Sequence, residues 1–476
     1  MDRREFLGAG VNLGAALAVR AVAAPAPDAG GHSIVLNVQA DDAYAAIVPD
    51  FIGLGYEISS ITRPGLLQPD NRVLLQLFHT LGAHGVVRVG GNTSDFAHYA
   101  ASGPPVSSAK GTVVDDAALQ RLGGFLAASG WKLIWGLNLG SGSEAAAIAE
   151  ARSVRSIAQD RLLAFEIGNE PDLFARAGHR NADYGYEQWL AEYRRYKAAL
   201  RAEFPGLPLA GPDAAGATGW VSRFATDEGS DAVLLTHHYY RGHQSPESTI
   251  DLLLGPDPKL QPQLDRLREA SIRSGVPYRI CEVNSFSGGG RPGVSDTMAG
   301  ALWALDYLYT LAANGCAGVN MEAGINHLDF VSSYSPIGED GVGVVQPKPE
   351  YYGMLAFALG GSGSLVRTAF ETAPDALRAY ATRSVQGALV LTLINKDAAA
   401  TTIDVHLRGA ARVDSAAIVR LNAPAVDAKQ DIHLGGSQLT PHGTWKAAMT
   451  ERTAVHSGRV RVGLPGYSAA ICTVSG

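Results

Sequence analysis

Two glutamates of the 476-residue chain stand where an unpaired charge would be costly. Glu170 ends the apolar stretch LAFEIGNE, directly before a proline, and Glu282 interrupts the apolar stretch PYRICEVNS. A carboxylate beside a buried strand needs a partner or a function, because moving a lone charge out of water is strongly unfavourable. Two such groups can cleave a glycosidic bond when one protonates the leaving oxygen and the other attacks the anomeric carbon. Taken singly, Glu170 is equally compatible with a helix cap or an arginine partner.

The elements that carry the two acids distinguish these possibilities. Strand-like and helix-like segments alternate along most of the chain, and their number over about 300 residues is typical of a (β/α)8 TIM barrel. The eight predicted strands are FIGLGYE (51–57), GVVRVGG (85–91), KLIWGLNL (132–139), LAFEIGNE (163–170), LPLAGPD (207–213), AVLLTHHYY (232–240), PYRICEVNS (277–285) and GCAGVNMEAG (315–324). A doubly wound sheet is the alternative, but RVGGNTSDF is followed by no GxGxxG pattern.

Reactive residues of a TIM barrel lie at the carboxyl ends of its strands. Glu170 and Glu282 end strands four and seven, so they are predicted to face each other across the barrel mouth. A separation of about 5–5.5 Å there is the geometry of a retaining glycosidase. Other polar side chains at or just beyond the strand ends are Glu57, Asn92, Asp95, Asn138, Asn169, His237, His238, Tyr239, Tyr240, Asn284, Glu322, Asn326 and His327.

The chain divides into four parts. Residues 1–30 contain Arg3-Arg4, Phe6-Leu7 and a short, weakly apolar run, which together predict a twin-arginine export signal with a linker. A disordered or amphipathic tail is the alternative, and it is supported by Arg20 late in the apolar run. Residues 31–48 are expected to cross over and join a C-terminal antiparallel β-sandwich at residues 361–476, while residues 49–360 form the barrel.

Composition excludes some classes of partner. A net charge of −7, spread evenly along the chain, leaves no electrostatic footprint for nucleic acid or for an anionic membrane once the signal is cleaved. The export signal predicts a periplasmic or secreted protein. Its three cysteines have no metal spacing and are expected to be buried thiols. His237 and His238 have no third ligand at matching spacing, so we expect no metal or organic cofactor, and one histidine is expected to bond to a catalytic carboxylate.

Several separate motifs resemble glycoside hydrolase family 79, which holds heparanase and exo-acting β-glucuronidases. The motifs are RVGGNTSDF, FEIGNEPDLF, THHYYRGH, ICEVNSFSGGGRPGVSD, MEAGINHLD and LPGYSAAICTV, and the resemblance spans residues 33–476. It implies a retaining exo-β-glycosidase, with a β-glucuronide or related oligosaccharide as the leading substrate.

The resemblance also implies roles for single residues. Glu170 would be the general acid/base and Glu282 the nucleophile, while Asn169 would bind the sugar 2-hydroxyl. Tyr240 would lie at the sugar, and His238 would lie at a catalytic carboxylate. Backbone that approaches the sugar closely is expected at Gly288, Gly289 and Gly324, and hydroxyl ligands are expected at Glu57, Asn92 and Asp95.

Two positions depart from the family pattern. Where the family often has a tyrosine, this chain has Ser287 before its glycine run and Asn326 after the eighth strand. Losing a hydroxyl donor to a sugar carboxylate removes a hydrogen bond worth about 1.5–3 kcal/mol. Either Arg241 or Arg291 replaces these donors, or the pocket takes a neutral sugar, such as glucose or a glucose-linked disaccharide. A non-catalytic secreted carbohydrate-binding protein is the alternative outside the enzymes, and an esterase is disfavoured because GxSxG is absent.

Overall fold

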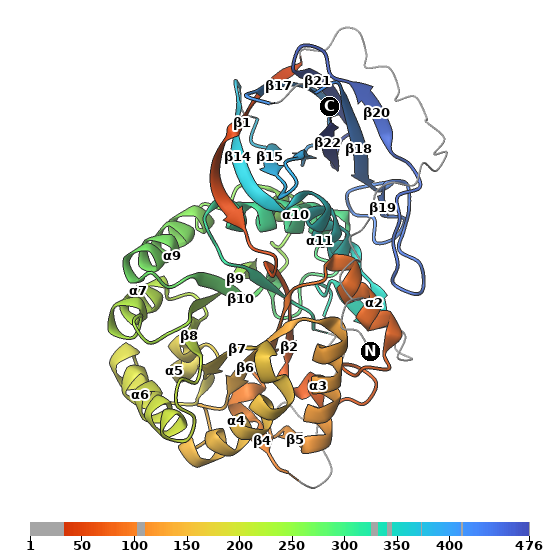
Figure 1. Cartoon of the computed structure of the whole chain (residues 1–476). Coiled ribbons are helices and arrows are strands. Elements are labelled where there is room, and N and C mark those ends of the chain that lie inside the picture. The colour runs from red at the N-terminus through yellow and green to blue at the C-terminus, as the bar shows by residue number, and fades with distance from the viewer. Residues whose placement is uncertain are drawn as a thin grey trace, which may run out of the picture.

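The computed structural model describes residues 33–101, 110–324, 332–339, 345–372, 374–410 and 413–475. The chain folds into a barrel ringed by helices and a second, all-β part above it (Figure 1). The predicted export signal and Asn326 lie outside the described residues.

Eight parallel strands close the barrel in the order β10-β11-β2-β3-β6-β7-β8-β9. Their bounds are β2 (Ile52–Glu57), β3 (Val86–Gly90), β6 (Lys132–Leu137), β7 (Leu162–Ile167), β8 (Leu209–Ala214), β9 (Leu234–His243), β10 (Tyr278–Ser287) and β11 (Val319–Glu322). Each observed strand falls within or overlaps one of the eight predicted segments, because apolar runs of this length bury both faces between the barrel interior and the helices.

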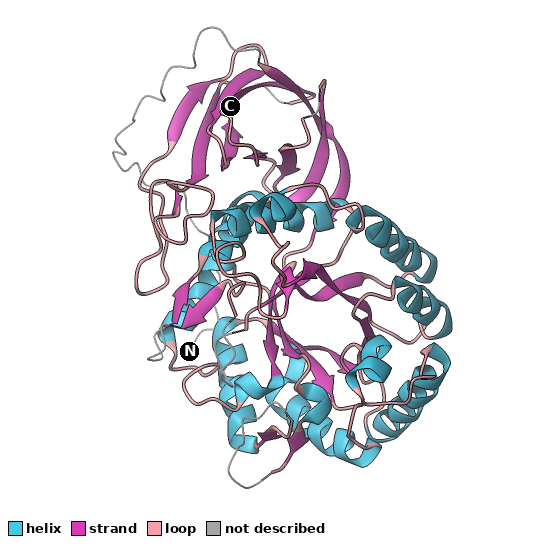
Figure 2. Ribbon diagram, turned by 180° about the vertical axis from the view of Figure 1, so that it is seen from behind, coloured by secondary structure: helices cyan, strands magenta, loops and turns pink. Residues whose placement is uncertain are grey.

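The helices surround the strands, as Figure 2 shows from behind. They are α1 (Ile58–Ile61), α2 (Arg72–Leu81), α3 (Asp116–Ser129), α4 (Glu144–Ala158), α5 (Phe174–Ala177), α6 (Tyr186–Glu203), α7 (Thr218–Asp227), α8 (Ile250–Leu254), α9 (Leu260–Ser274), α10 (Met298–Ala313) and α11 (Pro349–Gly360). Two small ladders pair β4 (His98–Tyr99) with β5 (Val113–Val114) and β12 (Ile337–Glu339) with β13 (Val345–Pro347). Side chains of Asn71, Asp115 and Ser143 cap the N-termini of α2, α3 and α4, so local sequence fixes where these helices begin.

The barrel interior changes from apolar to charged towards the mouth. One apolar cluster contains Val86, Ile134, Ala164, Ala210, Leu234 and Cys281, contributed by six different strands. Two residues further along β3 and β7 lie Arg88 and Glu166, both fully buried. Because side chains of a strand alternate between its two faces, these charged residues form the next interior layer and lie beneath the strand ends.

The all-β part is one ten-stranded sheet that follows the path β19-β18-β22-β16-β15-β14-β1-β17-β21, with β20 paired to β18. Its strands are β1 (Ile34–Ile47), β14 (Gly363–Phe370), β15 (Leu377–Arg383), β16 (Leu389–Asn395), β17 (Thr401–Arg408), β18 (Ser415–Asn422), β19 (His433–Leu434), β20 (Glu451–Ala454), β21 (Arg459–Leu464) and β22 (Ser468–Ser475). The sheet curls around a core of its own, to which most of these strands contribute alternate residues (Figure 1).

Strand β1 joins this sheet, as the sequence predicts. It pairs antiparallel with β14 and parallel with β17, while the other ladders of the sheet are antiparallel. The predicted fold class, a (β/α)8 barrel with a β-sandwich that an N-terminal strand completes, is therefore confirmed.

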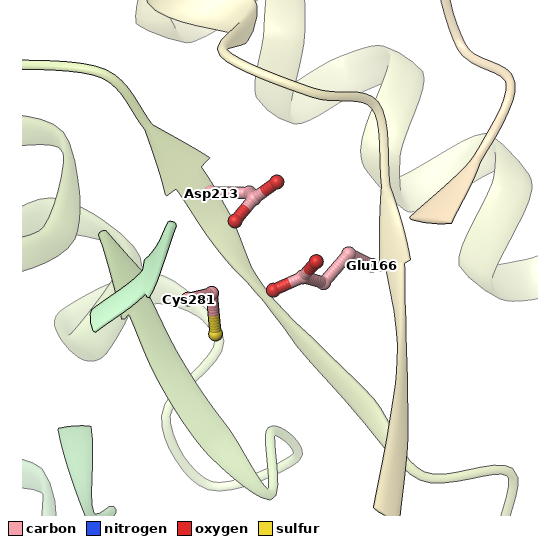
Figure 3. Close-up of side chains that lie close together, drawn as sticks. All are labelled: Glu166, Asp213 and Cys281. Carbon is pink, nitrogen blue, oxygen red and sulfur yellow. The ribbon is translucent and has the colours of Figure 1, made fainter. Parts of the chain in front are cut away.

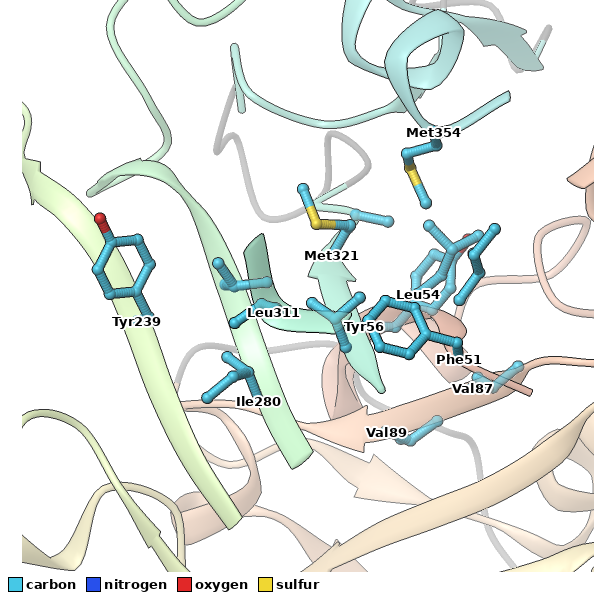
Figure 4. Packing of buried hydrophobic residues seen from close by; sticks show 14 of the residues in the cluster. Phe51, Leu54, Tyr56, Val87, Val89, Tyr239, Ile280, Leu311, Met321 and Met354 are labelled. Carbon is cyan, nitrogen blue, oxygen red and sulfur yellow. The ribbon is translucent and has the colours of Figure 1, made fainter. Parts of the chain in front are cut away.

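The two parts pack through α10 and α11. Ile394 of β16 and Ile471 of β22 belong to the same buried cluster as these two helices. The cluster extends to the barrel strands, where Leu54 and Met321 pack near Met354 of α11 (Figure 4). All seven residues of β16 are buried for this reason, since one face of the strand meets the sheet's own core and the other meets the helices.

Cys281, Cys316 and Cys472 are buried free thiols. Among the described residues, no helix combines the length and apolar character that crossing a bilayer requires.

Candidate active site

A cavity of about 670 Å³ opens at the carboxyl ends of the barrel strands. It brings together ten of the residues that the sequence predicts for the site: Glu57, Asn92, Glu170, His238, Tyr240, Glu282, Ser287, Gly288, Gly289 and Gly324. Asn169 and Asp95 lie behind its wall, and the prediction for Asn326 is not addressed by the described residues.

The two predicted catalytic acids lie close together. One carboxylate oxygen of Glu170, one of Glu282 and a ring nitrogen of His238 all lie within 4.8 Å of one another. The register of β9 and β10 places Glu282 beside His238, while Glu170 follows β7 from across the barrel. Glu170 has φ 50° and ψ 50°, a left-handed conformation that is uncommon for a residue with a side chain and is found at functional sites.

Arg88 connects Glu282, the predicted nucleophile, to the buried layer below it. Its Nη1 donates to Glu282 Oε2 at 2.8 Å, and its Nη2 donates to Asn169 Oδ1 at 2.8 Å and to Asp213 Oδ2 at 2.6 Å. Its Nε donates to Glu166 Oε2 at 3.1 Å. The guanidinium therefore holds one oxygen of Glu282 in place and stabilises negative charge on it. Sequence analysis missed Arg88, although a lone arginine inside the apolar strand VVRVG is itself a signal of a buried partner.

His238 lies between two carboxyl groups. Its Nε2 is 2.8 Å from Asp213 Oδ1 and its Nδ1 is 3.0 Å from Glu170 Oε1. Burial opposes protonation of the ring, but the negative charges of Asp213 and Glu282 outweigh it and raise the pKa of His238 well above its usual value. Burial likewise opposes ionisation of Asp213, yet Arg88 and His238 hold the pKa of Asp213 below its usual value. The ring is thus an imidazolium that orients Glu170, which confirms that a histidine bonds to one of the two acids.

Glu170 is set up to carry a proton. Burial raises its pKa above the ordinary value, and the nearby Glu282 charge adds to this effect, while the hydrogen bond and charge of His238 act in the opposite direction. A carboxyl group with a raised pKa can give up a proton and take it back near neutral pH.

Asp95 does not grip a sugar hydroxyl, contrary to our expectation from the sequence. Its carboxylate is 2% exposed and accepts from the backbone N–H groups of Leu139, Gly140 and Asn169. These bonds tie the segments that follow β6 and β7 to each other. Asp95 therefore positions the backbone next to Glu170 from behind the cavity wall.

Asn169, predicted to bind the sugar 2-hydroxyl, has its side chain in the same network. Its Oδ1 accepts from Arg88, and its Nδ2 donates to Asn92 Oδ1 at 3.3 Å. Glu57 lines the cavity, but its oxygens accept from the backbone N–H groups of Asn92 and Thr93 and from the Thr93 hydroxyl. Burial raises the pKa of Glu57 to about 6.

The opposite wall is built from the ends of β9 and β10 and the glycine loop that follows β10. Tyr240 Oη donates to Glu282 Oε1 at 2.9 Å, so both oxygens of Glu282 have a donor. Ser287 Oγ lies 3.0 Å from His243 Nδ1, and the loop continues through Gly288, Gly289 and Gly290, which have φ values of 82°, 91° and 81°. A side chain at Gly290 would collide with Ser333, which packs on this loop.

Several further cavity residues were not assigned to the site from the sequence, among them Tyr334, Glu322 and Lys259. Tyr334 lines the cavity beside Tyr240, with 6.1 Å between ring centroids. Tyr334 thus supplies a phenol to a cavity where the sequence predicts that family tyrosines are missing. It comes from a segment well beyond β11, so its place in the cavity could not be predicted from the end of a strand. Glu322, the last residue of β11, also lines the cavity. It was noted as a strand-end acid without a role.

Neither arginine proposed as a replacement lines the cavity. Arg241 points away from it and pairs with Asp257 at 3.4 Å, because it alternates with Tyr240 along β9. Arg291 lines a separate surface pocket beside Pro246. The suggestion that one of them binds a sugar carboxylate is therefore wrong for the described geometry.

Within the part of the chain that the structure describes, two groups of side chains have the composition of metal ligands. Figure 3 shows Glu166, Asp213 and Cys281 converging inside the barrel, and Arg88 donates to both carboxylates of this group. In the second group, Glu170, His238 and Glu282, each ring nitrogen of His238 is bonded to a carboxylate, an arrangement of an imidazolium rather than of a metal-bound ring. Both groups are thus suited to charge balance and proton transfer.

Comparison with known proteins agrees with this chemistry. A β-glucuronidase of Aspergillus niger is 28% identical over 377 residues, which cover 71% of this chain and 67% of that protein. A β-glucuronidase of Neurospora crassa is 26% identical over 363 residues, or 67% of this chain and 63% of that protein. The chain thus spans about two thirds of the length of these curated relatives. No protein-family model matches it.

Solved structures share the fold. A 4-O-α-L-rhamnosyl-β-D-glucuronidase from Fusarium oxysporum, in complex with Rha-GlcA, has a TM-score of 0.75 at 18% identity and covers 92% of this chain and 100% of that chain. An α-L-arabinofuranosidase from Thermotoga maritima has a TM-score of 0.68 at 14% identity and covers 93% and 99%. The protein is a glycoside hydrolase. Its substrate is a carbohydrate, and the cavity with the paired acids is its candidate active site.

Proposed function

We propose that this glycoside hydrolase is a retaining exo-β-glucuronidase of the family 79 type, with Glu282 as nucleophile and Glu170 as acid/base. The observation that carries the proposal is the approach of the two carboxylates to within 4.8 Å. Retaining enzymes keep their carboxyl groups about 5–5.5 Å apart, whereas inverting enzymes need a wider gap for a water molecule. The names of the two sequence relatives and of the structural neighbour support a glucuronide as substrate.

The surroundings of each acid match its role in a double displacement. In the first step Glu170 donates its proton to the leaving oxygen as Glu282 attacks the anomeric carbon, so the glycosidic bond breaks and a glycosyl–Glu282 ester forms. In the second step Glu170, now a carboxylate, takes a proton from water, which attacks the same carbon and releases Glu282. Arg88 and Tyr240 stabilise the charge that returns to Glu282.

The role of Glu170 is tested by its dependence on the leaving group. Glu170→Ala should lose little activity on an aryl β-glucuronide with a strongly acidic phenol, because that leaving group needs little protonation. The same variant should lose about 100-fold or more on a poor leaving group, within the range that general acid catalysis contributes. Equal losses on both substrates would contradict the assignment.

A neutral-sugar β-glycosidase is the second candidate. Ser287 lines the cavity where a tyrosine would add a donor, and neither Arg241 nor Arg291 does so. We therefore compare aryl β-glucuronide with aryl β-glucoside in the wild type and in Ser287→Tyr. The proposal expects the wild type to prefer the glucuronide and Ser287→Tyr to strengthen that preference. A wild-type preference for the glucoside would favour the second candidate.

We also propose that residues 1–30 direct export of the folded protein by the twin-arginine route to the periplasm or beyond. The Arg3-Arg4 pair in the sequence supports this proposal. Replacing both arginines with lysine should leave the enzyme in the cytoplasmic fraction of a bacterial host. Unchanged export of that variant would contradict it.

A further inference from the structure

Glu322 lies at a distinct position in the cavity. It ends β11, between β10 with Glu282 and β2 with Glu57. The residue is 5% exposed, and its Oε2 is buried without a hydrogen-bond partner among the described residues. A methyl group at Gly55 would come within 2.7 Å of this oxygen, so the missing side chain there makes room for the carboxyl group. A buried polar atom without a partner on the wall of a binding cavity is an available contact for a ligand.

The groups around Glu322 favour its uncharged form. Burial raises the pKa of Glu322 well above its usual value, and the charges of Glu282 and Glu57 raise it further. Arg88 and His238 act in the opposite direction, but their donors are bonded to other carboxylates and amides. The remaining titratable groups whose charges interact with this carboxyl group are the phenols Tyr56, Tyr240 and Tyr334. The raised pKa favours the carboxylic acid form of Glu322, which can donate as well as accept.

The order of the strands places Glu322 on the sugar side of the bond to be cleaved. Glu170, which protonates the leaving oxygen, follows β7, whereas β11 lies on the opposite side of the closed barrel. A sugar whose anomeric carbon is at Glu282 therefore extends over β11 and β2, away from Glu170.

Hydrogen bonds hold together the corner of the cavity next to β11. Asn284 Nδ2 donates to the backbone oxygens of both Glu322 and Tyr334, at 3.2 Å and 3.3 Å. Ser333, next to Tyr334, donates through its backbone N–H to Gly289. The backbone of Glu322, of Tyr334 and of the glycine loop is thus joined at this corner, and the side chains of Glu322 and Tyr334 line the cavity there. Besides His238, the cation among the described lining residues is Lys259, just before α9.

We propose that Glu322 is a specificity residue of the sugar subsite and that its carboxylic acid donates a hydrogen bond to the carboxylate of a bound uronic acid. This inference rests on the proposed β-glucuronidase function. Two carboxyl groups that share one proton attract each other, whereas two carboxylates repel. Glu322 therefore binds the uronate only while it carries its proton, and the resulting bond couples uronate binding to proton uptake.

Substitutions at Glu322 separate hydrogen bonding from charge. Glu322→Gln keeps the size and a donor but cannot ionise, whereas Glu322→Ala removes the donor. On an aryl β-glucuronide we expect Glu322→Ala to raise KM about tenfold or more with a smaller change in kcat. We expect Glu322→Gln to stay within about threefold of wild type at acidic pH and to lose less kcat/KM than wild type as the pH rises. Thermal unfolding of both variants shows whether they are folded.

Glu150→Gln is the matched control. Glu150 is also 5% exposed and burial raises its pKa to about 7, but its carboxylate accepts from Trp135 outside the cavity. This variant should leave KM unchanged. Equal KM values for wild type and Glu322→Ala would overturn the proposal. Equal losses of kcat/KM in Glu322→Ala and Glu322→Gln would overturn it as well.

Calorimetric titration with D-glucuronate tests the same point without turnover. At alkaline pH, binding to the wild type should take up protons, measured in buffers of different ionisation enthalpy, and binding to Glu322→Gln should take up fewer. Glucuronate binding with the same proton uptake in both proteins would overturn the role of Glu322 alone. Binding of glucose but not of glucuronate, with hydrolysis of aryl β-glucosides, would overturn the proposed glucuronidase function as well.

Discussion

At the scale of single residues, Glu170 and Glu282 differ in what their oxygens contact. Glu282 accepts from Arg88 and from Tyr240, two donors that stabilise a carboxylate. Glu170 has one contact of this kind, with His238, and burial raises its pKa. The contacts of the two acids therefore match the different roles that the proposed double displacement gives them.

Tyr240→Phe tests the stabilisation of Glu282. The change removes a hydrogen bond to a charged group, worth about 1.5–3 kcal/mol, so kcat/KM on an aryl β-glucuronide should fall about 10- to 100-fold. Tyr186→Phe is the control, because its hydroxyl bonds to Asp227 on the outer helices. Similar activity of Tyr240→Phe and the control would show that Glu282 does not depend on this donor.

The pH dependence follows from Glu170. Because its pKa is raised and the reaction begins with its acid form, kcat at saturating substrate should fall on the alkaline side as Glu170 loses its proton. In Glu170→Ala, assayed with a strongly acidic leaving group, this alkaline fall should be absent. A wild-type profile that is unchanged in the variant would mean that another group titrates.

The sequence reveals the acids but not the charges that orient them. Glu170 and Glu282 could be predicted because each ends an apolar run. Arg88 and Asp213 could not be assigned, because their contacts with His238 and Glu282 form only when four strands, β3, β8, β9 and β10, come together in the closed barrel. Asp213 nevertheless ends the predicted fifth strand, so inspecting every strand end would have found it.

At the scale of elements, Asp95 is the residue that ties strand ends together. It accepts from three backbone N–H groups that follow β6 and β7, including that of Asn169 beside Glu170, the proposed acid/base. Sequence analysis assigned it to substrate binding because polar residues at strand ends can have either role. Only the contacts show that its oxygens are already used within the protein.

Asp95→Ala should therefore reduce both stability and activity. Leaving buried N–H groups without partners costs about 1–3 kcal/mol each, so the midpoint of urea unfolding should fall clearly. In assays under conditions in which the variant is folded, kcat should fall by a larger factor than KM rises, because Glu170 is displaced while the contacts with the sugar persist. A raised KM with unchanged kcat would instead indicate direct contact between Asp95 and substrate.

At the scale of the whole molecule, the sheet domain covers one side of the barrel. The alternation of residues in β17 and β22 could be read from the sequence, but the burial of both faces of β16 could not, because it depends on α10 and α11. Ile394→Ala should lower the free energy of unfolding by about 2–5 kcal/mol through the cavity it leaves. Val385→Ala, at a residue that is 88% exposed, should leave it almost unchanged. Comparable effects of the two changes would contradict the packing of β16 against the helices.

Buried acids also make the stability of the whole protein depend on pH. Burial raises the pKa of Glu150 to about 7, so its contribution to stability is present below the unfolded-state pKa and is lost as the pH rises through about 7. Glu150→Gln removes this loss. Relative to wild type, the variant should gain up to about 1.4 kcal/mol of unfolding free energy per pH unit between about pH 5 and about pH 7. A difference in unfolding free energy that is constant across this range would mean that Glu150 does not titrate there.

The central claim, that Glu282 is the nucleophile of a retaining mechanism, is tested most directly by trapping the glycosyl–enzyme ester. The enzyme is incubated with a 2-deoxy-2-fluoro-β-glucuronosyl fluoride, which forms the ester but slows its hydrolysis, and the labelled peptide is sequenced by mass spectrometry. The expected result is a single label on Glu282 in the peptide that contains ICEVNSF. A label on Glu170, Glu57 or Glu322, or turnover of the probe with inversion at the anomeric carbon, would contradict it.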